Sequence, residues 1–400
     1  MELTRKQAEI RATILDQLYA KRPISRIDIA KETLITPATT GNVINELIKQ
    51  GFIEERGEVS NDRAGRKKLL LDIAPHQYFY LGVEISEKYL ALAIVDNVGE
   101  VLASTEKATS PQEKPTDADI IHLIQDFLSQ ENSYQISGIG IGLPGYAAIA
   151  ENPGIISNNP YWEKINLRRL IQAFNIPVYL GNKSHCLALS ERLFSYHSKD
   201  SNFIVYHVAR GIHYSYVYQG KVYSQDNFLI GEIGHTIINP QGEKCSCGKQ
   251  GCLQAYASEA ALINKANILF DSPVSLLQTL VKKKEQLTLQ TLLTAYQLGD
   301  LGIIRLIETA CNYLAISLSN LCQIIDTERI YLDGEIFSSP IITELILSQL
   351  KGRTQLFPLQ KEVEFQVIPF SPTNMARAAV SLCIHHDFLD KENTHPLSGT

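Results

Sequence analysis

The beginning of the chain alternates apolar and polar positions at the spacing of amphipathic helices, in three successive stretches. The first stretch covers residues 4–20 and ends before Pro23. The second begins at Ser25, a residue type that caps helix N-termini well. The third begins with Thr36 as its cap and Pro37 at the first helical position, where proline is favoured. The residues predicted to face inward from this third helix are Val43, Ile44, Leu47 and Ile48.

Two strand-like segments, 52–56 and 68–73, follow the third helix, and the polar loop between them contains Arg66 and Lys67. Three helices followed by a basic hairpin predict a winged helix-turn-helix over residues 1–74. The formal charge of these residues is +2, whereas the other 326 residues carry −8. A slightly basic head on an acidic body is typical of a small DNA-binding module attached to a domain with another task.

From Tyr78 onward, short apolar strands such as LALAIVD and ISGIGIGLPG alternate with helices, for example near 117–129 and 166–174. This alternation predicts α/β lobes with mixed sheets. A similar series begins near Phe203 and includes a long apolar helix at about 302–325. The expected organisation is a head over residues 1–74, a first lobe over 75–200, a second lobe over 201–388 and a polar tail over 389–400.

The composition indicates the class of protein and the cellular compartment in which it is expected. Hydrophobic residues make up 44% of the chain and charged residues 20%, which is typical of a globular protein. The sequence has no uninterrupted run of the roughly 18 apolar residues that a membrane span needs. Its first residues lack the apolar core of a secretory signal peptide. We therefore expect a cytoplasmic protein with no membrane insertion.

The outward face of the third helix carries short polar side chains that can approach base edges in a major groove. Arg66, at the hairpin tip, is expected to enter an adjacent minor groove. The residues predicted to contact double-stranded DNA are Thr36, Ala38, Thr39, Asn42, Asn45, Arg66 and Lys67. The basic residues expected to hold phosphates are Arg22, Arg26, Lys31 and Lys49. A solvated helical bundle or a protein-binding winged module would show the same pattern, and the basic hairpin favours DNA.

Three of the seven cysteines lie within eight residues, in the segment CSCGKQGC. Together with a nearby histidine they supply four ligands, which suits a closed, tetrahedral and therefore structural zinc site. The predicted ligands are His235, Cys245, Cys247 and Cys252. Gly248 and Gly251 are expected to let the backbone curl so that the sulfurs converge. The other cysteines, which are expected to be core residues, are Cys186, Cys311, Cys322 and Cys383.

The ordered motifs GIGIGLPG, NPYW, GNKSHCLAL, GEIGH and CSCGKQGCLQ resemble those of the ROK family (repressors, open reading frames, kinases). The head sequence resembles the winged helix-turn-helix of its transcriptional-repressor branch, which includes the xylose repressors, so that the resemblance covers nearly the full length. It implies an N-terminal winged helix-turn-helix followed by a two-lobe α/β body of the actin and hexokinase (ribonuclease H-like) kind. In the family's kinases, sugar and ATP bind in the cleft between the lobes.

Several positions depart from the family's kinase pattern. The phosphate-binding motif Asp-x-Gly-Gly-Thr is replaced by residues 84–88, EISEK, and the second phosphate turn, Gly-Thr-Gly-Ile-Gly, by residues 209–213, ARGIH. The glycine-rich turn near adenosine is reduced to residues 333–335, DGE. Lys183 stands where the family has the aspartate that takes a proton from the sugar hydroxyl, and a lysine cannot act as a carboxylate base. We therefore expect no ATP binding and no enzyme activity.

The residues that contact sugar hydroxyls in the family are largely kept. Gln254 replaces a second glutamate and can still form a hydrogen bond to a hydroxyl. Lys183 can donate to a hydroxyl or pair with an anionic group, so a neutral sugar and a sugar phosphate or acid both remain open. The residues that the resemblance implies for effector binding are Asn159, Asn182, Lys183, Glu232, His235 and Gln254.

The resemblance implies a sugar-responsive regulator, specifically a repressor of carbohydrate uptake or catabolism genes that a sugar releases from its operator. A helix-turn-helix reading two half-sites implies a homodimer, or a dimer of dimers, on a pseudo-palindrome. The alternative is a ROK regulator controlled by protein docking, with a vestigial sugar cleft. An active kinase with an added head would need an ATP site that the motifs do not provide.

Overall fold

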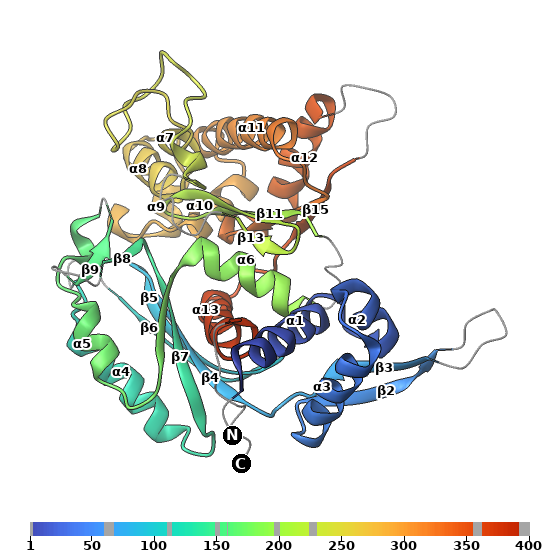
Figure 1. Cartoon of the computed structure of the whole chain (residues 1–400). Helices are drawn as coiled ribbons and strands as arrows, with labels where there is room; N and C mark the ends of the chain where they lie inside the picture. Colours follow the sequence, from blue (N-terminus) through green and yellow to red (C-terminus); the bar gives the residue numbers. More distant parts are fainter. Residues whose placement is uncertain are drawn as a thin grey trace. The chain divides into compact units, whose positions relative to one another are not determined.

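The computed structural model describes residues 3–391 except for 60–67, 110–113, 149–152, 158, 196–200, 224–229 and 355–361. The chain divides into two compact units. The first unit combines residues 1–199 with 372–400, and the second comprises residues 200–371 (Figure 1). The expectation that 201–388 forms one lobe therefore differs from the structure, because the chain returns to the first unit at residue 372.

The head forms the predicted three helices and hairpin. Its elements are α1 (Arg5–Lys21), α2 (Arg26–Thr33), α3 (Pro37–Lys49), β1 (Ile24–Ser25), β2 (Ile53–Val59) and β3 (Lys68–Ile73), and the sheet order is β1-β3-β2. Thr4, Ser25 and Thr36 accept hydrogen bonds from backbone N–H groups of the first turns, so both predicted caps, Ser25 and Thr36, are confirmed. Ile44 and Leu47 are buried, whereas Val43 and Ile48 are half-buried.

The rest of the first unit is a mixed five-stranded sheet in the order β10-β7-β4-β5-β6. Strands β4, β5 and β6 pair antiparallel, whereas β7 and β10 run parallel to β4. The strands are β4 (Phe79–Ile85), β5 (Tyr89–Asp96), β6 (Val101–Ala108), β7 (Ile136–Leu143) and β10 (Val178–Asn182), with a small pair β8 (Tyr146–Ala148) and β9 (Gly154–Ile156). The helices are α4 (Asp117–Gln130), α5 (Leu167–Gln172), α6 (Lys183–Phe194) and α13 (Asn374–Ile384).

Helix α13 lies directly on the sheet of the first unit. A Cβ at Gly82 of β4 would lie 1.8 Å from the carbonyl oxygen of Ala376, and one at Gly140 of β7 would lie 2.1 Å from that of Ala379. The two glycines therefore let the helix backbone touch the strands, which places α13 with this sheet. A π-helical turn follows at His385–Leu389. Its last residue, Leu389, is buried, so packed structure extends to that residue.

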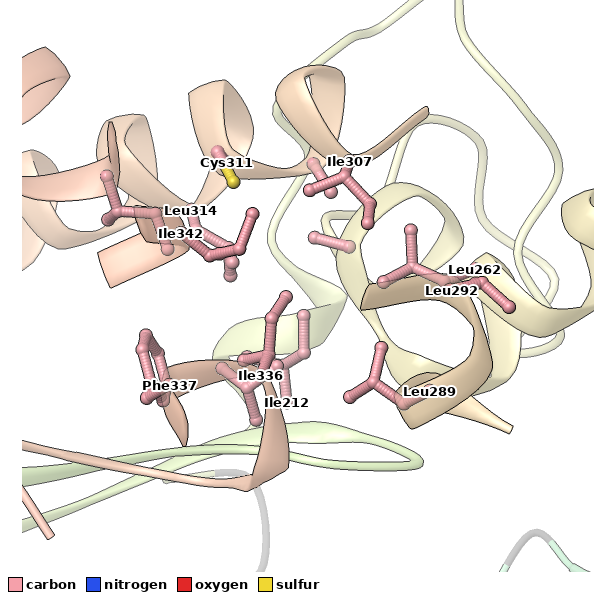
Figure 2. Close-up of a cluster of buried hydrophobic side chains, with 14 of the residues drawn as sticks. Ile212, Leu262, Leu289, Leu292, Ile307, Cys311, Leu314, Ile336, Phe337 and Ile342 are labelled. Atoms are coloured by element: carbon pink, nitrogen blue, oxygen red, sulfur yellow. The ribbon is translucent and has the colours of Figure 1, made fainter. Parts of the chain in front are cut away.

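The second unit is built on a sheet in the order β13-β12-β11-β14-β15. The strands are β11 (Phe203–Val208), β12 (Ile212–Tyr218), β13 (Lys221–Val222), β14 (Arg329–Asp333) and β15 (Glu364–Val367). The helices are α7 (Gln254–Ala257), α8 (Glu259–Leu269), α9 (Leu277–Leu280), α10 (Leu289–Gln297), α11 (Leu301–Ile324) and α12 (Pro340–Thr354). Figure 2 shows the apolar core, in which Ile307 and Leu314 of α11 meet side chains from α8, α10 and α12.

Helix α11 is, among the described residues, long and apolar enough to cross a membrane by composition. Its inner face, including Ile303, Ile307 and Leu318, is fully buried in the core of the second unit. A helix that already buries its apolar face in this way is a core helix, which agrees with the absence of a membrane span expected from the sequence. Cys311, on the same helix, is buried as expected.

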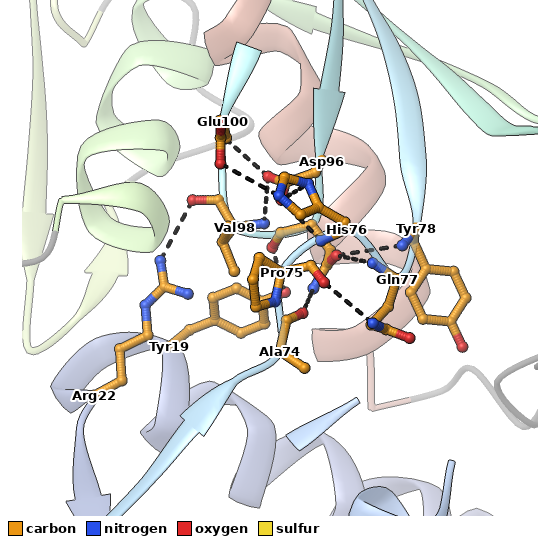
Figure 3. A network of polar contacts seen from close by, with 11 residues as sticks. Tyr19, Arg22, Ala74, Pro75, His76, Gln77, Tyr78, Asp96, Val98 and Glu100 are labelled. Carbon is orange, nitrogen blue, oxygen red and sulfur yellow. Dashed lines mark hydrogen bonds and ion pairs between the residues drawn. The ribbon is translucent and has the colours of Figure 1, made fainter. Parts of the chain in front are cut away.

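The head is held against the rest of the first unit by a polar network (Figure 3). The Tyr19 hydroxyl donates to the carbonyl of Asn97 at 2.8 Å. The Arg22 guanidinium donates to the carbonyls of Val98 at 3.4 Å and Leu193 at 3.3 Å. Arg22 is only 5% exposed, so the prediction that it holds a DNA phosphate is wrong. This arginine instead satisfies carbonyl groups of the body, including one in the last turn of α6.

Candidate functional site

Helix α3 presents the predicted polar face to solvent. Ala38, Asn42 and Asn45 are exposed, and the buried residues of the helix lie on its other face. The Oδ1 atom of Asn45 accepts a hydrogen bond from Arg26 at 2.7 Å, which orients this amide. Arg26 also pairs with Glu55, at 3.1 Å, so its position in the structure is set by the head itself.

Two other predicted DNA contacts close the start of α3. The backbone N–H of Thr39 donates to the Thr36 hydroxyl, and the two hydroxyl oxygens lie 2.9 Å apart. The Thr36 side chain thus caps the helix, and the Thr39 hydroxyl contacts the capping oxygen. Lys31 and Lys49 are exposed. The predicted wing-tip residues, Arg66 and Lys67, lie outside the described residues.

The predicted metal ligands converge in the second unit. One ligand atom each from His235, Cys245, Cys247 and Cys252 lies within 4.8 Å of all the others. Cys245 Sγ is 3.6 Å from His235 Nδ1, and Cys247 Sγ is 3.7 Å from Cys252 Sγ. A tetrahedral ion with Zn–S bonds of about 2.3 Å and a Zn–N bond of about 2.0 Å separates its ligand atoms by roughly 3.5–3.8 Å. The donor set and its spacing therefore fit zinc.

The loop that carries these ligands depends on two glycines, as predicted. Gly248 and Gly251 have φ values of 89° and 79°, in the region that favours glycine. A Cβ at Gly251 would lie 1.7 Å from the carbonyl oxygen of Asn239, so the chain can fold back only at a residue without a side chain. Burial lowers the pKa of His235 and favours the neutral imidazole, which is the form that binds a metal.

Three predicted effector residues lie together beside this metal cluster. Glu232 and His235 belong to one short turn, with Glu232 Oε2 3.9 Å from His235 Nε2. Gln254 begins α7, and its Oε1 would lie 2.9 Å from a Cβ at Gly234. The other Glu232 oxygen, Oε1, lies 3.3 Å from Nδ1 of His213. Burial alone raises the pKa of Glu232, but the hydrogen bond and charge of His213, together with His235, outweigh it and leave the pKa lowered.

The other three predicted effector residues lie in the first unit. The Asn182 Oδ1 accepts from Ser184 N at 2.9 Å and caps α6. Asn159 accepts from Tyr161 N at 3.1 Å and donates to Glu87. Both asparagines therefore organise the local backbone, whatever else they bind. The structure places these three residues in one unit and Glu232, His235 and Gln254 in the other.

The ammonium group of Lys183 has a carboxylate partner that sequence reasoning did not assign. Lys183 Nζ lies 2.7 Å from Glu84 Oε1, and the two side chains are 17% and 7% exposed. Glu84 is near the end of β4 and Lys183 is the first residue of α6, so the pair joins a strand to a helix. The sequence signal was the lysine at the position of the family's catalytic aspartate, while Glu84 keeps an acid at the first position of the phosphate motif.

Comparison with known proteins identifies the family of this chain. The model of the ROK family matches residues 80–383, and the model of the MarR family matches residues 10–64. This chain belongs to the ROK family. The predicted combination of a winged helix-turn-helix with a ROK body is thereby confirmed.

Two groups of ROK relatives are similar over most of the chain. The xylose repressor of Bacillus subtilis (strain 168) is 26% identical over 384 residues, covering 94% of this chain and 95% of that protein. The N-acetylglucosamine repressor of Escherichia coli O157:H7 is 26% identical and covers 86% of each.

Solved ROK structures show the same fold. A ROK transcriptional regulator, a homologue of the Escherichia coli MLC protein, superposes with a TM-score of 0.73 at 24% identity over 96% of this chain and 98% of its own. A ROK glucokinase from Streptomyces griseus, bound to glucose and AMPPNP, has a TM-score of 0.64 at 20% identity over 76% of this chain and 98% of its own. The actin and hexokinase-like body expected from the sequence is thus confirmed at the level of the fold.

At the positions that match phosphate-site turns of the ROK kinases, polar side chains lie close to one another or to the backbone. In the turn near the adenosine site, Asp333 lies 2.5 Å from Nδ1 of His207, and both side chains are largely buried. In the second phosphate turn, a Cβ at Gly211 would lie 2.7 Å from His213 Nε2, so the imidazole fills the space beside this glycine. These positions carry side-chain pairs where phosphate binding requires open backbone N–H groups.

Proposed function

We propose that this chain is a cytoplasmic, sugar-responsive transcriptional repressor of carbohydrate uptake or catabolism genes. The observation that carries the proposal is one chain with an exposed reading face on α3 and a ROK body that keeps Glu232, His235 and Gln254 close together. The similarity to repressors named for xylose and for N-acetylglucosamine supports the same conclusion. A sugar that binds the DNA-free form more tightly than the bound form would release the operator.

The first experiment measures DNA release directly. A duplex that the protein selects from a random-sequence library is labelled, and its binding is followed by fluorescence anisotropy with and without D-xylose or N-acetylglucosamine. We expect one of these sugars to weaken binding at least tenfold, and substitution of Asn42 or Asn45 by alanine to weaken it without sugar. Binding that no sugar alters would favour the alternative, in which a docked protein controls the regulator.

We propose further that the body performs no phosphate transfer. A general base must accept the proton of the sugar hydroxyl, and the residue at that position is Lys183, which pairs with Glu84 at 2.7 Å. A protonated amine held by a carboxylate has no free electron pair for this task. The assay is sugar-dependent ADP release, and a turnover comparable to that of a ROK kinase would contradict the proposal.

Zinc bound by His235, Cys245, Cys247 and Cys252 would have a structural task. Four protein ligands leave no open position for a substrate, so the ion would supply cross-linking and no reaction chemistry. Glu232 lies on the turn that carries His235, and Gln254 follows Cys252 by two residues. The ion would therefore stiffen the segment that positions both proposed effector contacts.

Helix α6 is the proposed route from effector to head within the first unit. It begins with Lys183, and in its last turn Arg192 lies 2.5 Å from Asp16 of α1 while the carbonyl of Leu193 accepts from Arg22. A helix of 12 residues is about 18 Å long and moves as one rigid element. If a ligand displaced the first turn of α6, the contacts between the last turn of α6 and α1 would therefore be displaced as well.

The proposed route is tested by weakening only its far end. Asp16→Asn keeps the size of the side chain and removes the charge that faces Arg192. We expect operator affinity without sugar to stay within about twofold, and the ratio of affinities without and with sugar to fall. Asp126→Asn, on the exposed face of α4, is the matched control. An unchanged ratio in Asp16→Asn would remove α6 from the proposed route.

The proposed DNA-binding form is a homodimer, or a dimer of dimers, on a pseudo-palindromic operator. Two helix-turn-helix heads that read half-sites related by a twofold axis need such symmetry. Sedimentation of the protein with and without the selected duplex measures the assembly. One protomer bound per duplex would contradict it.

A further inference from the structure

Glu84 and Lys183 meet at the edge of the sheet where α/β proteins bind ligands. Strands β4, β7 and β10 are parallel, and the register places Glu84 beside Gly142 and Gly142 beside Gly181. All three positions are therefore at the carboxyl ends of their strands, which is the ligand-binding edge of such sheets. Lys183 follows directly at the start of α6. Gly142 and Gly181 carry no side chain, so neither offers a hydrogen-bonding group to Glu84 from these two positions.

Among the described residues, only one oxygen of Glu84 has a hydrogen-bond partner. Oε1 accepts from Lys183 at 2.7 Å, whereas Oε2 is buried and has no hydrogen-bond partner among the described residues. The residue as a whole is 5% exposed. A buried acceptor without a partner is unfavourable, and more so when it carries charge. Such an atom at a ligand-binding edge lacks a hydrogen-bond donor, and the described residues do not supply one.

The charge of the pair limits which donor it can be. The ammonium of Lys183 compensates the carboxylate of Glu84, so the edge carries no net charge from these two residues. An anionic group approaching Oε2 would meet a carboxylate, and a cationic group would meet the ammonium. A neutral hydroxyl can donate to Oε2 without either repulsion, and its own oxygen can accept in turn.

We infer that Glu84 is an effector-binding residue that accepts a hydroxyl of a neutral sugar, and that the Glu84–Lys183 pair discriminates against phosphorylated and acidic sugars. The inference rests on the proposed sugar-binding function and narrows its effector to a neutral polyol. It also gives Lys183 a defined task, which is to compensate and orient the accepting carboxylate. Because Lys183 is the first residue of α6, the same pair places the effector contact at the start of the proposed route, which leads along α6 to the DNA-binding domain.

The test uses the full-length, zinc-loaded protein and isothermal calorimetry. Wild-type protein is titrated with D-xylose, D-glucose and N-acetylglucosamine, and then with the phosphorylated or acidic form of the sugar that binds most tightly. We expect the neutral form to bind at least tenfold more tightly. Tighter binding of the anionic form by wild type overturns the inference. Failure of wild type to bind any sugar would instead refute the proposed function, and it is measured first.

The variant Glu84→Gln then assigns the effect to this residue. It keeps the shape of the side chain but leaves Lys183 without a counter-charge. We expect neutral-sugar affinity to fall at least tenfold, and the preference for the neutral over the anionic form to shrink or invert. Unchanged affinity and preference would overturn the inference, because a residue that only stabilises the fold would not set this ratio.

Two comparisons keep the result interpretable. Glu163→Gln, which alters an exposed glutamate of the same unit, should leave both affinity and preference as in wild type. If Glu84→Gln does not unfold cooperatively, a deoxy-sugar series on wild type replaces it. Removal of one hydroxyl should then weaken binding at least tenfold, since Glu84 Oε2 would again lack a donor. Equal affinity for every deoxy form would overturn the inference.

Discussion

At the scale of single residues, Leu34 has an unexpected backbone geometry. It ends α2 with φ 59° and ψ 19°, in the left-handed region, and its side chain is 92% exposed. A residue with a Cβ pays about 1–2 kcal/mol in this conformation. Exposure on this scale means that no buried contact of the side chain offsets the strain.

We therefore predict that Leu34→Gly stabilises the head by about 0.5–1 kcal/mol, because relief of strain exceeds the extra chain entropy that glycine loses on folding. Thermal unfolding monitored by circular dichroism measures the change. Leu34→Ala keeps the Cβ and should show no gain. A glycine variant less stable than wild type would show that the leucine side chain has a stabilising contact.

A second residue-scale prediction concerns pH. Burial, together with the charges of His385 and His386, lowers the pKa of His185 to about 4. The unfolded state, with a histidine pKa of about 6.5, takes up this proton first as the pH falls. Stability should therefore decline from about pH 6.5 to pH 4, by up to about 3 kcal/mol from this residue. Urea unfolding midpoints of wild type and His185→Gln should converge as the pH falls. His122→Asn serves as the surface control. Parallel midpoint curves for wild type and His185→Gln would contradict the predicted contribution of His185.

Residue-scale interactions were predictable from the sequence only where they are local. The caps at Ser25 and Thr36 follow from residues three positions apart, and both are present. The partners of Arg22 and Lys183 lie far along the chain, at Leu193 and Glu84. No periodicity connects such positions, so the sequence alone predicts a phosphate contact for Arg22 and leaves open whether Lys183 binds a hydroxyl or an anionic group.

At the scale of elements, the contact between α13 and the first sheet depends on glycine. Gly140 faces the helix backbone, where a Cβ would meet the carbonyl of Ala379 at 2.1 Å. Gly142 lies two residues further on the same face, but its nearest neighbour would be the Met375 side chain at 3.5 Å, an ordinary contact. The two positions differ in whether backbone or side chain must move.

We predict that Gly140→Ala destabilises the first unit by more than about 2 kcal/mol, since a helix backbone cannot yield as a side chain can. Gly142→Ala, its matched control, should change stability by less than about 1 kcal/mol. Thermal unfolding and soluble yield compare the two variants. Equal effects of the two substitutions would mean that the helix can shift on the sheet without a loss of stability.

Most elements were predictable because hydrophobic periodicity sets them locally, as the close agreement for α3 and α11 shows. The element against which a helix or strand packs is not predictable in the same way. The expected second lobe over residues 201–388 includes the helix at 374–384, because the pattern of a helix does not indicate which sheet it covers. The available signal was the alternating glycine in GIGIG, which marks a strand that another backbone approaches closely.

At the scale of the whole molecule, loss of the proposed zinc ion should affect sugar binding but not DNA binding. Without the ion, thiolates that lie close together repel, and burial with neighbouring thiols raises the pKa of Cys252 to about 12. We predict that chelation, or Cys247→Ser, abolishes sugar binding but leaves operator affinity within about threefold. Metal analysis, calorimetry and anisotropy on the same sample test this. A metal-free protein that still responds to sugar would contradict it.

The first unit is built from two separate parts of the chain, which affects the order in which the units can fold during synthesis. The ribosome completes residues 200–371 before it reaches α13, whereas the sheet of the first unit needs that helix to cover Gly82 and Gly140. Phe388, whose ring lies 4.6 Å from that of Phe52 in the head, is made later still. We expect the second unit to fold first on the nascent chain, although it follows most of the first in sequence. A message truncated before codon 374 would then yield a folded second unit and a head with no finished surface to dock against, so only complete translation products can bind DNA in a regulated way.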